Sequence, residues 1–134
     1  RHLHIPFTLN YMKASSYGQN GVISGELKIT GLENLDLTSK DVLIIDDIFD
    51  TGKTMATIVQ QLQSKNPKSL KSLVLLSKKN PQQITYYQPD YVLFEIENRF
   101  VVGFGLDYKE YYRGLPGIYA FINDTPPATI GKSP

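Results

Sequence analysis

Three aspartates and a turn that contains two threonines stand together near the middle of the chain. Asp46 and Asp47 are followed by Asp50, and the next four residues are Thr-Gly-Lys-Thr (51–54). Carboxylates this close repel one another unless a cation or the hydroxyl groups of a ligand compensate them. Unpaired backbone N–H groups at the start of a helix bind phosphate, and threonine hydroxyls add donors. The stretch therefore predicts a ligand with a phosphate and a diol, and it allows for Mg²⁺ beside them.

The residues on either side of this stretch predict the elements that position it. Val42 to Ile45 are consecutive apolar residues, which is typical of a parallel strand buried on both faces. After the turn, apolar residues recur with the spacing of a helix that packs one face against a sheet: Met55, Ile58, Val59 and Leu62. Asn66-Pro67 ends this pattern. The acidic turn thus follows the carboxyl end of a strand, where open α/β sheets bind their ligands.

The rest of the chain predicts short strands joined by polar connections. Lys78 follows the end of one of these strands, and residues 80–89 form a polar connection with two prolines. The expected strands are Phe7 to Lys13, Gly25 to Leu32, Leu70 to Leu76, Tyr91 to Ile96 and Ile118 to Ile122.

Composition and charge exclude several classes of protein. The chain has 134 residues, 14 basic and 13 acidic, so a net charge of +1 gives no reason to expect nucleic acid or a membrane surface as a partner. It has no cysteine, which excludes disulfides and thiolate metal sites. No apolar run approaches the roughly 20 residues of a membrane span, and the first ten residues do not read as a signal peptide. We therefore expect one cytoplasmic domain.

The sequence D-D-I-F-D-T-G-K-T resembles the phosphoribosyl diphosphate (PRPP) loop of type I phosphoribosyltransferases, in particular the hypoxanthine-guanine branch. The resemblance implies an α/β fold with a twisted, mainly parallel sheet flanked by helices and a flexible active-site loop. It also implies that Asp46 and Asp47 bind the ribose hydroxyls and Mg²⁺, and that Asp50 is the general base near purine N7. The residues expected to hold the 5′-phosphate are Asp50, Thr51, Gly52, Lys53 and Thr54.

A second stretch, residues 94–113, resembles the purine-binding segment of the same family. The resemblance implies that Phe100 stacks on the base and that the backbone of Val101 meets the base edge. It further implies that Asp107 lies near a second metal and the purine 2-position, and that Arg113 contacts pyrophosphate. Without the resemblance, residues 100–104 would be a core strand, and Asp107 and Arg113 would be ordinary surface residues.

Two further positions take a role from the resemblance. Lys78 matches a lysine that donates to the exocyclic O6 of the purine, and because lysine has donors but no acceptor, it favours a 6-oxopurine over adenine. Residues of a small polar segment match the flexible loop that closes over the active site and excludes water. By composition alone this segment would be an ordinary hairpin loop. The matching residues are Ser15, Ser16, Tyr17 and Gly18.

The resemblance implies a purine salvage enzyme. Such an enzyme transfers the phosphoribosyl group of PRPP to N9 of hypoxanthine or guanine, releases pyrophosphate, uses Mg²⁺ and forms homodimers or homotetramers. The resemblance covers residues 5–124, and the family's N-terminal segment with its pyrophosphate loop has no counterpart before residue 7. We therefore expect a phosphoribosyltransferase domain over residues 1–124, incomplete at its N-terminus, and a disordered tail over residues 125–134.

Other functions fit parts of the pattern. A P-loop would need glycine five positions before Gly52, where Asp47 stands, and a phospho-receiver domain would need a further aspartate after residues 73–76. A non-catalytic nucleotide-binding or regulatory protein on the same scaffold stays open, because a fold does not determine a function. His2 and His4 alternate as metal ligands can, but with no carboxylate nearby they are expected to be surface residues.

Overall fold

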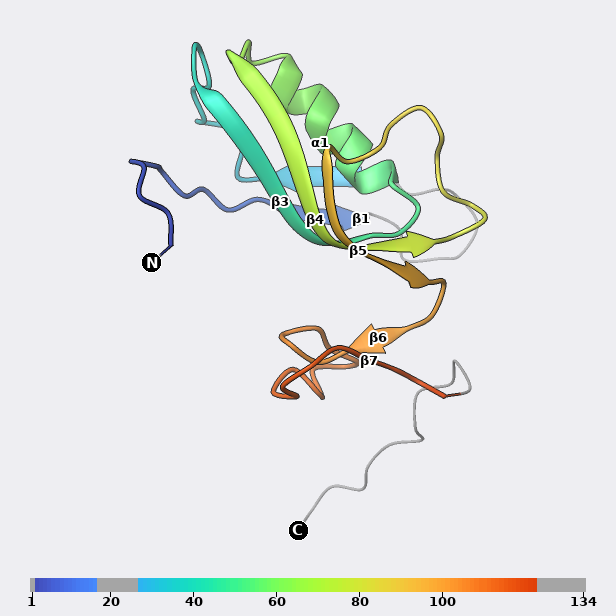
Figure 1. Cartoon of the computed structure of the whole chain (residues 1–134). Helices are drawn as coiled ribbons and strands as arrows, with labels where there is room; N and C mark the ends of the chain where they lie inside the picture. Colours follow the sequence, from blue (N-terminus) through green and yellow to red (C-terminus); the bar gives the residue numbers. More distant parts are fainter. Residues whose placement is uncertain (1, 17–26, 123–134) are drawn as a thin grey trace.

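The computed structural model describes residues 2–16 and 27–122. Its centre is a parallel sheet of three strands in the order β3-β4-β5: β3 (Asp41–Phe49), β4 (Ser69–Lys79) and β5 (Tyr91–Glu97). All three strands end on the same side, toward a separate lobe (Figure 1). The described residues contain no helix long and apolar enough to cross a lipid bilayer.

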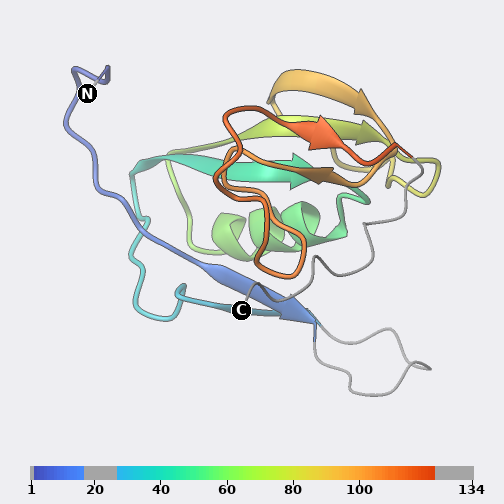
Figure 2. The same cartoon turned by 90° about the horizontal axis from the view of Figure 1, so that it is seen from below.

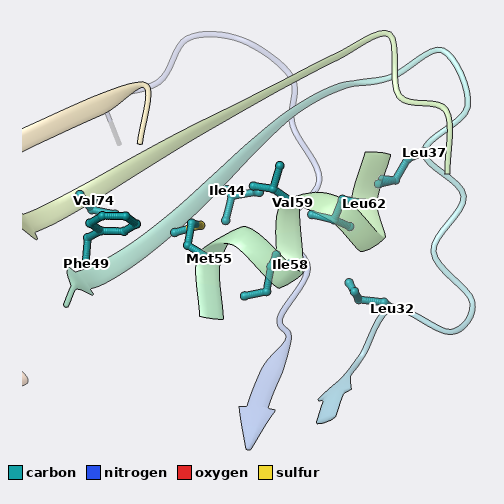
Figure 3. Close-up of a cluster of buried hydrophobic side chains, with 9 residues drawn as sticks. All are labelled: Leu32, Leu37, Ile44, Phe49, Met55, Ile58, Val59, Leu62 and Val74. Carbon is teal, nitrogen blue, oxygen red and sulfur yellow. The ribbon is translucent and has the colours of Figure 1, made fainter. Parts of the chain in front are cut away.

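The helix between β3 and β4, α1 (Lys53–Gln63), packs on one face of this sheet. Its buried residues are the four predicted from the sequence spacing, and they meet Ile44, Phe49 and Val74 of the sheet (Figure 3). Those four residues are Met55, Ile58, Val59 and Leu62. An apolar stripe at helical spacing is buried because only one side of α1 can face the sheet. The predicted strand, acidic turn and helix are therefore confirmed in order.

The other face of the sheet differs from the prediction. Ile44 is 3% exposed, but its neighbours Leu43 and Ile45 are 50% and 67% exposed. Successive side chains of a strand point to opposite faces, and in the described residues α1 covers one face only. The prediction that residues 42–45 are buried on both faces is therefore wrong for this structure.

The strands β3 and β4 are also longer than their apolar runs predicted. β3 runs on through Asp46 and Asp47, and β4 includes Lys78, which pairs with Ile96 of β5. Ladder hydrogen bonds join backbone groups, so pairing continues past the point where the side chains become polar. Asp46 and Lys78 thus lie on strands, whereas the sequence placed them just after strand ends.

A two-stranded antiparallel pair lies on the far side of α1 from the sheet, as Figure 2 shows. It consists of β1 (Lys13–Ser16) and β2 (Leu27–Thr30). The strand predicted over residues 7–13 is wrong, because β1 starts only at Lys13. The apolar residues of segment 7–13 alternate as they would in a strand, but Phe7 and Tyr11 are 64% and 82% exposed. β2 falls within the strand predicted from residue 25, and residues 25–26 lie outside the described part.

The lobe follows β5 and contains a short antiparallel pair, β6 (Val101–Val102) and β7 (Tyr119–Ala120). Figure 2 shows it in front of the carboxyl ends of the parallel strands. Leu76 of β4 forms one buried cluster with Val101 and Leu106, and this cluster attaches the lobe to the sheet. The strand predicted over residues 118–122 is present but shorter, as is the strand that residues 100–104 would form without the resemblance.

Candidate active site

A pocket of about 200 Å³ opens between the ends of β3 and β4 and the lobe. Six of its lining residues were predicted as site residues from the sequence: Asp47, Lys78, Phe100, Val101, Asp107 and Arg113. Three more were not predicted: Ile48, Gly105 and Leu106. Ile48 lies between two acidic positions, and nothing in the residue types of the other two marks a site. The structure therefore brings residues from three separate stretches of the chain into one cavity.

Phe100, which lines the pocket, belongs to a cluster of aromatic rings with Tyr108 and Phe121 that we call the aromatic wall. The ring of Phe100 stacks on Phe121, with centroids 5.8 Å apart and planes 29° apart, and it meets Tyr108 edge-on at 5.7 Å. The guanidinium of Arg99 donates to the carbonyl oxygens of Phe121 and Ile122, the latter at 2.7 Å. Phe100 is still 40% exposed. Its ring is thus held by neighbours while part of it stays free to stack on a planar ligand.

Lys78 and Asp50 face each other where β3 and β4 end. The Lys78 side chain is 11% exposed, and its Nζ lies 3.5 Å from Oδ2 of Asp50. Oδ1 of Asp50 accepts a hydrogen bond from the Asn80 amide at 2.6 Å. The Gln83 amide donates to the main-chain oxygens of Asp50 and Lys78, at 3.1 and 2.9 Å. Asn80 and Gln83 were missed in the sequence, where they form part of a polar connection.

The two neighbouring acids of β3 lie in different environments. Asp47 is exposed and lines the pocket, whereas Asp46 is largely buried and does not line it. Burial raises the pKa of Asp46 to about 6. The hydrogen bond from the main-chain N–H of Asp47, at 3.0 Å, partly offsets this increase, and the negative charge of Asp47 adds to it. Asp47, and not Asp46, is therefore the acid of this pair that lines the pocket.

The predicted phosphate turn precedes α1. Gly52 is the N-cap residue, has φ +85° and supplies no side-chain cap. A Cβ on Gly52 would lie 2.5 Å from Cζ of Phe49 and 2.8 Å from Cγ1 of Ile84, so only glycine fits. The first turn of α1 begins at Lys53, whose side chain is exposed. N–H groups at such a helix start, on the positive end of the helix dipole, suit an anion.

Asp107 and Arg113 form an ion pair on the lobe side of the pocket. Their nearest atoms, Oδ1 and Nη2, are 3.2 Å apart, and Arg113 also donates to the main-chain oxygen of Gly105 at 2.9 Å. Oδ2 of Asp107 accepts the main-chain N–H of Glu110 at 2.7 Å. Both side chains are thus oriented at the edge of the pocket by contacts within the lobe.

The acidic side chains suit Mg²⁺ by type and number. Mg²⁺ is commonly bound through one or two carboxylates together with substrate phosphates and water, rather than by an all-protein cage. Asp47 and Asp107 line the same pocket from opposite sides. Among residues 2–16 and 27–122, no group of three or more His, Cys, Asp or Glu side chains could hold a metal ion by itself. The donors therefore fit a cation that arrives with a phosphorylated ligand.

The remaining predicted site residues lie away from the pocket or outside the described part. Ser15 and Ser16 end β1, and Tyr17 and Gly18 fall outside the described residues, as does the tail over residues 125–134. His2 and His4 are exposed, as expected.

A family profile described as "Phosphoribosyl transferase domain" matches residues 1–109. The chain belongs to this phosphoribosyltransferase family. It is 46% identical over 112 residues to the hypoxanthine-guanine phosphoribosyltransferase of Sus scrofa. The matched stretch covers 83% of this chain and 50% of that relative. The chain thus spans about half the length of the curated mammalian relatives it matches.

Solved structures agree with this family and with the fold. A hypoxanthine-guanine phosphoribosyltransferase from Bacillus anthracis is 32% identical, with a TM-score of 0.78, over 90% of this chain and 71% of that one. The hypoxanthine phosphoribosyltransferase of Trypanosoma cruzi, in complex with the product IMP, is 34% identical, with a TM-score of 0.74, over 87% of this chain and 60% of that one. The predicted type I phosphoribosyltransferase fold is therefore confirmed.

Proposed function

We propose that this phosphoribosyltransferase chain acts in purine salvage. It transfers the 5-phosphoribosyl group of PRPP to N9 of hypoxanthine or guanine, and it releases IMP or GMP and pyrophosphate. The observation that carries the proposal is the pocket, which Lys78, Phe100 and Asp47 line together next to Asp50. The names of the similar proteins, and the IMP complex of the Trypanosoma cruzi relative, support the same reaction.

The purine binds between the aromatic wall and Lys78. Phe100 offers an exposed ring for stacking, and the buried backbone of Val101 offers hydrogen-bonding groups to the base edge. The ammonium of Lys78 can donate to a 6-oxo group but cannot accept from the 6-amino group of adenine. Because the Lys78 side chain is 11% exposed, a mismatched base would leave it poorly solvated. The expected preference is therefore for 6-oxopurines.

The phosphoribosyl part binds on the other side of Asp50. The turn from Thr51 to Thr54 holds the 5′-phosphate at the start of α1, while Asp46 and Asp47 bind the ribose hydroxyls. Arg113 holds the pyrophosphate through its planar set of donors. For this it exchanges its contact with Asp107 for phosphate oxygens.

Asp47 and Asp107 are the residues of the pocket that would hold Mg²⁺, with Asp46 behind Asp47. Bound there, Mg²⁺ would neutralise charge on pyrophosphate and make it a better leaving group.

The chain's own residues stabilise charge and handle one proton during transfer. As purine N9 bonds to ribose C1, the bond from C1 to the pyrophosphate oxygen breaks, and pyrophosphate leaves with that electron pair. Positive charge builds on the ribose, where the carboxylate of Asp47 stabilises it. Asp50 accepts or holds the proton of purine N7 as N9 bonds, which is a general-base role.

Assembly and location follow from the family resemblance and belong to the same proposal. We expect homodimers or homotetramers in the cytoplasm, with no nucleic acid or membrane as partner. Sedimentation of the purified protein measures the oligomeric state.

An assay with PRPP, Mg²⁺ and each of hypoxanthine, guanine, xanthine and adenine tests the reaction. Nucleotide and pyrophosphate should form with hypoxanthine and guanine, and not with adenine. Asp50→Asn, which keeps the shape of the side chain and removes its basicity, should lower turnover by about 10²-fold or more. If neither turnover nor binding of IMP or GMP is found, the proposal is wrong. Tight binding of IMP with no turnover would instead support a non-catalytic nucleotide-binding protein.

A further inference from the structure

The connection after β4 is folded back onto the acidic turn after β3. We call residues 80–84 the clasp. Besides the Asn80 and Gln83 contacts, the main-chain N–H of Ile84 donates to the oxygen of Thr51 at 2.9 Å. In the clasp, the Asn80 side chain thus contacts the Asp50 carboxylate, whereas Gln83 and Ile84 contact main-chain oxygens of the turn. These two kinds of contact have different consequences.

The hydrogen bonds around Asn80 determine how its amide is oriented. Its Oδ1 accepts the main-chain N–H of Gln82 at 2.9 Å, so its Nδ2 must be the group that faces Asp50. Its main-chain N–H donates to the oxygen of Lys78 at 2.8 Å, and its main-chain oxygen accepts from Gln83 at 3.0 Å. Three hydrogen bonds therefore fix Asn80, and its side-chain amide cannot flip without losing one of them.

This donor makes the two oxygens of Asp50 unequal. Oδ1 is occupied by Asn80 at 2.6 Å, whereas Oδ2 lies 3.5 Å from the Lys78 ammonium. A close charged pair of this type has its atoms about 2.7–2.9 Å apart, so Oδ2 is only loosely engaged. Asp50 is 46% exposed, which leaves it room to meet a ligand. Oδ2 is thus the oxygen that can accept a proton.

We propose that Asn80 is a positioning residue for Asp50. By holding Oδ1, it reserves Oδ2 for the N7 proton of the incoming purine. The inference rests on the transfer reaction proposed above, in which that proton goes to Oδ2 as the bond from N9 to C1 forms. Lys78 then turns from Oδ2 to the purine 6-oxo group. Without Asn80 the carboxylate rotates toward Lys78 and offers the proton acceptor in a poorer direction.

Gln83 has a different part, because it contacts main-chain oxygens only. Its amide ties the backbone of Asp50 to that of Lys78 whatever the side chain at position 50 is. Loss of Gln83 should therefore loosen both strand ends and weaken substrate binding. Loss of Asn80 should act on the carboxylate alone. Loss of Gln83 should therefore change KM, whereas loss of Asn80 should change kcat.

The test is a double-variant cycle with Asn80→Ala and Asp50→Asn. Asn80→Ala should lower kcat about tenfold or more, because small misplacements of a reacting group are costly, and leave the KM for PRPP within about twofold. In the Asp50→Asn background, Asn80→Ala should have little further effect, since its role passes through that carboxylate. Asn80→Asp, which keeps the size but replaces the donor with a second negative charge beside Asp50, should lower kcat at least as much. Gln63→Ala, an exposed amide at the far end of α1, is the matched control.

The outcomes separate this inference from the proposed reaction. An equal loss from Asn80→Ala in both backgrounds would assign Asn80 a merely structural role and overturn the inference. If the parent chain has no transferase activity, the proposed reaction fails for it, and crystal structures of the parent and Asn80→Ala then decide. A rotated Asp50 carboxylate in Asn80→Ala would support positioning, and an unchanged one would refute it. If Asn80→Ala does not fold, the near-isosteric Asn80→Leu, which removes the amide donor without adding a charge, gives the same comparison.

Discussion

Asp46 and Asp47 are adjacent in β3, but only Asp47 lines the pocket, while the largely buried Asp46 carboxylate accepts the main-chain N–H of Asp47 at 3.0 Å. Burial disfavours the charged form of a carboxyl group, which is why the pKa of Asp46 is raised to about 6. Two identical residues that are adjacent in the sequence therefore lie in different environments. The first prediction follows from this difference.

Asp46→Asn should stabilise the fold above pH 6. The pKa of the Asp46 carboxyl is about 6 in the folded state, against the ordinary value of 3.8 expected for the unfolded chain. Below pH 3.8 the carboxyl is neutral in both states and its contribution to the stability is fully present. This contribution is lost as pH rises through 6, because the half-buried carboxyl must then carry a charge. Asparagine cannot ionise and escapes this loss. The free energy of unfolding, measured in urea, should rise by about 1–2 kcal/mol at pH 8 and change little at pH 4.

Asp41→Asn is the control of opposite sign for that experiment. A hydrogen bond from Ser69 lowers the pKa of Asp41, so its charged form is favoured in the folded state. Its replacement should not stabilise the protein at pH 8. The same gain from Asp46→Asn at pH 4 and pH 8 would contradict the explanation by charge.

Lys78→Met should reduce discrimination between 6-oxo and 6-amino purines. Methionine keeps the length of the side chain and removes its donors, so hypoxanthine loses a charged hydrogen bond that adenine never makes. The ratio of kcat/KM for hypoxanthine to that for adenine should fall roughly 10- to 100-fold. This corresponds to the loss of about 1.5–3 kcal/mol of transition-state binding. Lys79→Met is the control, because Lys79 is exposed and paired with Glu97 at 2.9 Å. An unchanged ratio in Lys78→Met would exclude this role.

Phe100→Ala should weaken binding of the purine nucleotide, since the ring is the exposed member of the aromatic wall. Loss of one stacking contact costs about 1–3 kcal/mol, which calorimetry with GMP can measure. Phe121→Ala should cost less, because Phe121 supports Phe100 from behind. Phe104→Ala, at a residue that is 67% exposed, should leave the affinity unchanged. Equal losses at positions 100 and 104 would contradict stacking.

Gly52→Ala should destabilise the protein and abolish phosphate binding at the turn before α1. A methyl group there would come within 2.5 Å of the Phe49 ring, and alanine is strained at φ +85°. We expect a loss of more than about 1 kcal/mol in the free energy of unfolding. Gly114→Ala, where a Cβ would meet no atom within 4 Å, is the matched control. Normal stability of Gly52→Ala would show that the turn is less tightly packed than described.

Much of the parallel core was predictable because its signals are local. The stripe of α1 follows from spacing alone, and the turn that begins at Asp50 follows β3 directly in the chain. The strand predicted over residues 7–13 shows where local patterns fail. Its alternation is clear, yet Phe7 and Tyr11 stay exposed, because a strand also requires a backbone partner.

The purine side of the candidate site was predictable only through the family resemblance. Lys78, Phe100 and Asp107 were found through the family resemblance, and they do line one pocket. Their roles stay predictions. Asn80 and Gln83 could not be found, since an amide in a polar connection gives no sign of which distant carboxylate it contacts.

The amino-acid sequence by itself determined the order of strand, turn and helix, together with the side-chain types available for a phosphate and a diol. These depend on neighbours within a few residues, and local pattern is enough to read them. Only the tertiary structure decided which of two adjacent aspartates faces the pocket, and that Asn80 holds Asp50 from 30 residues away. Burial and long-range hydrogen bonds arise when the β3 and β4 ends meet, and no local pattern contains that meeting.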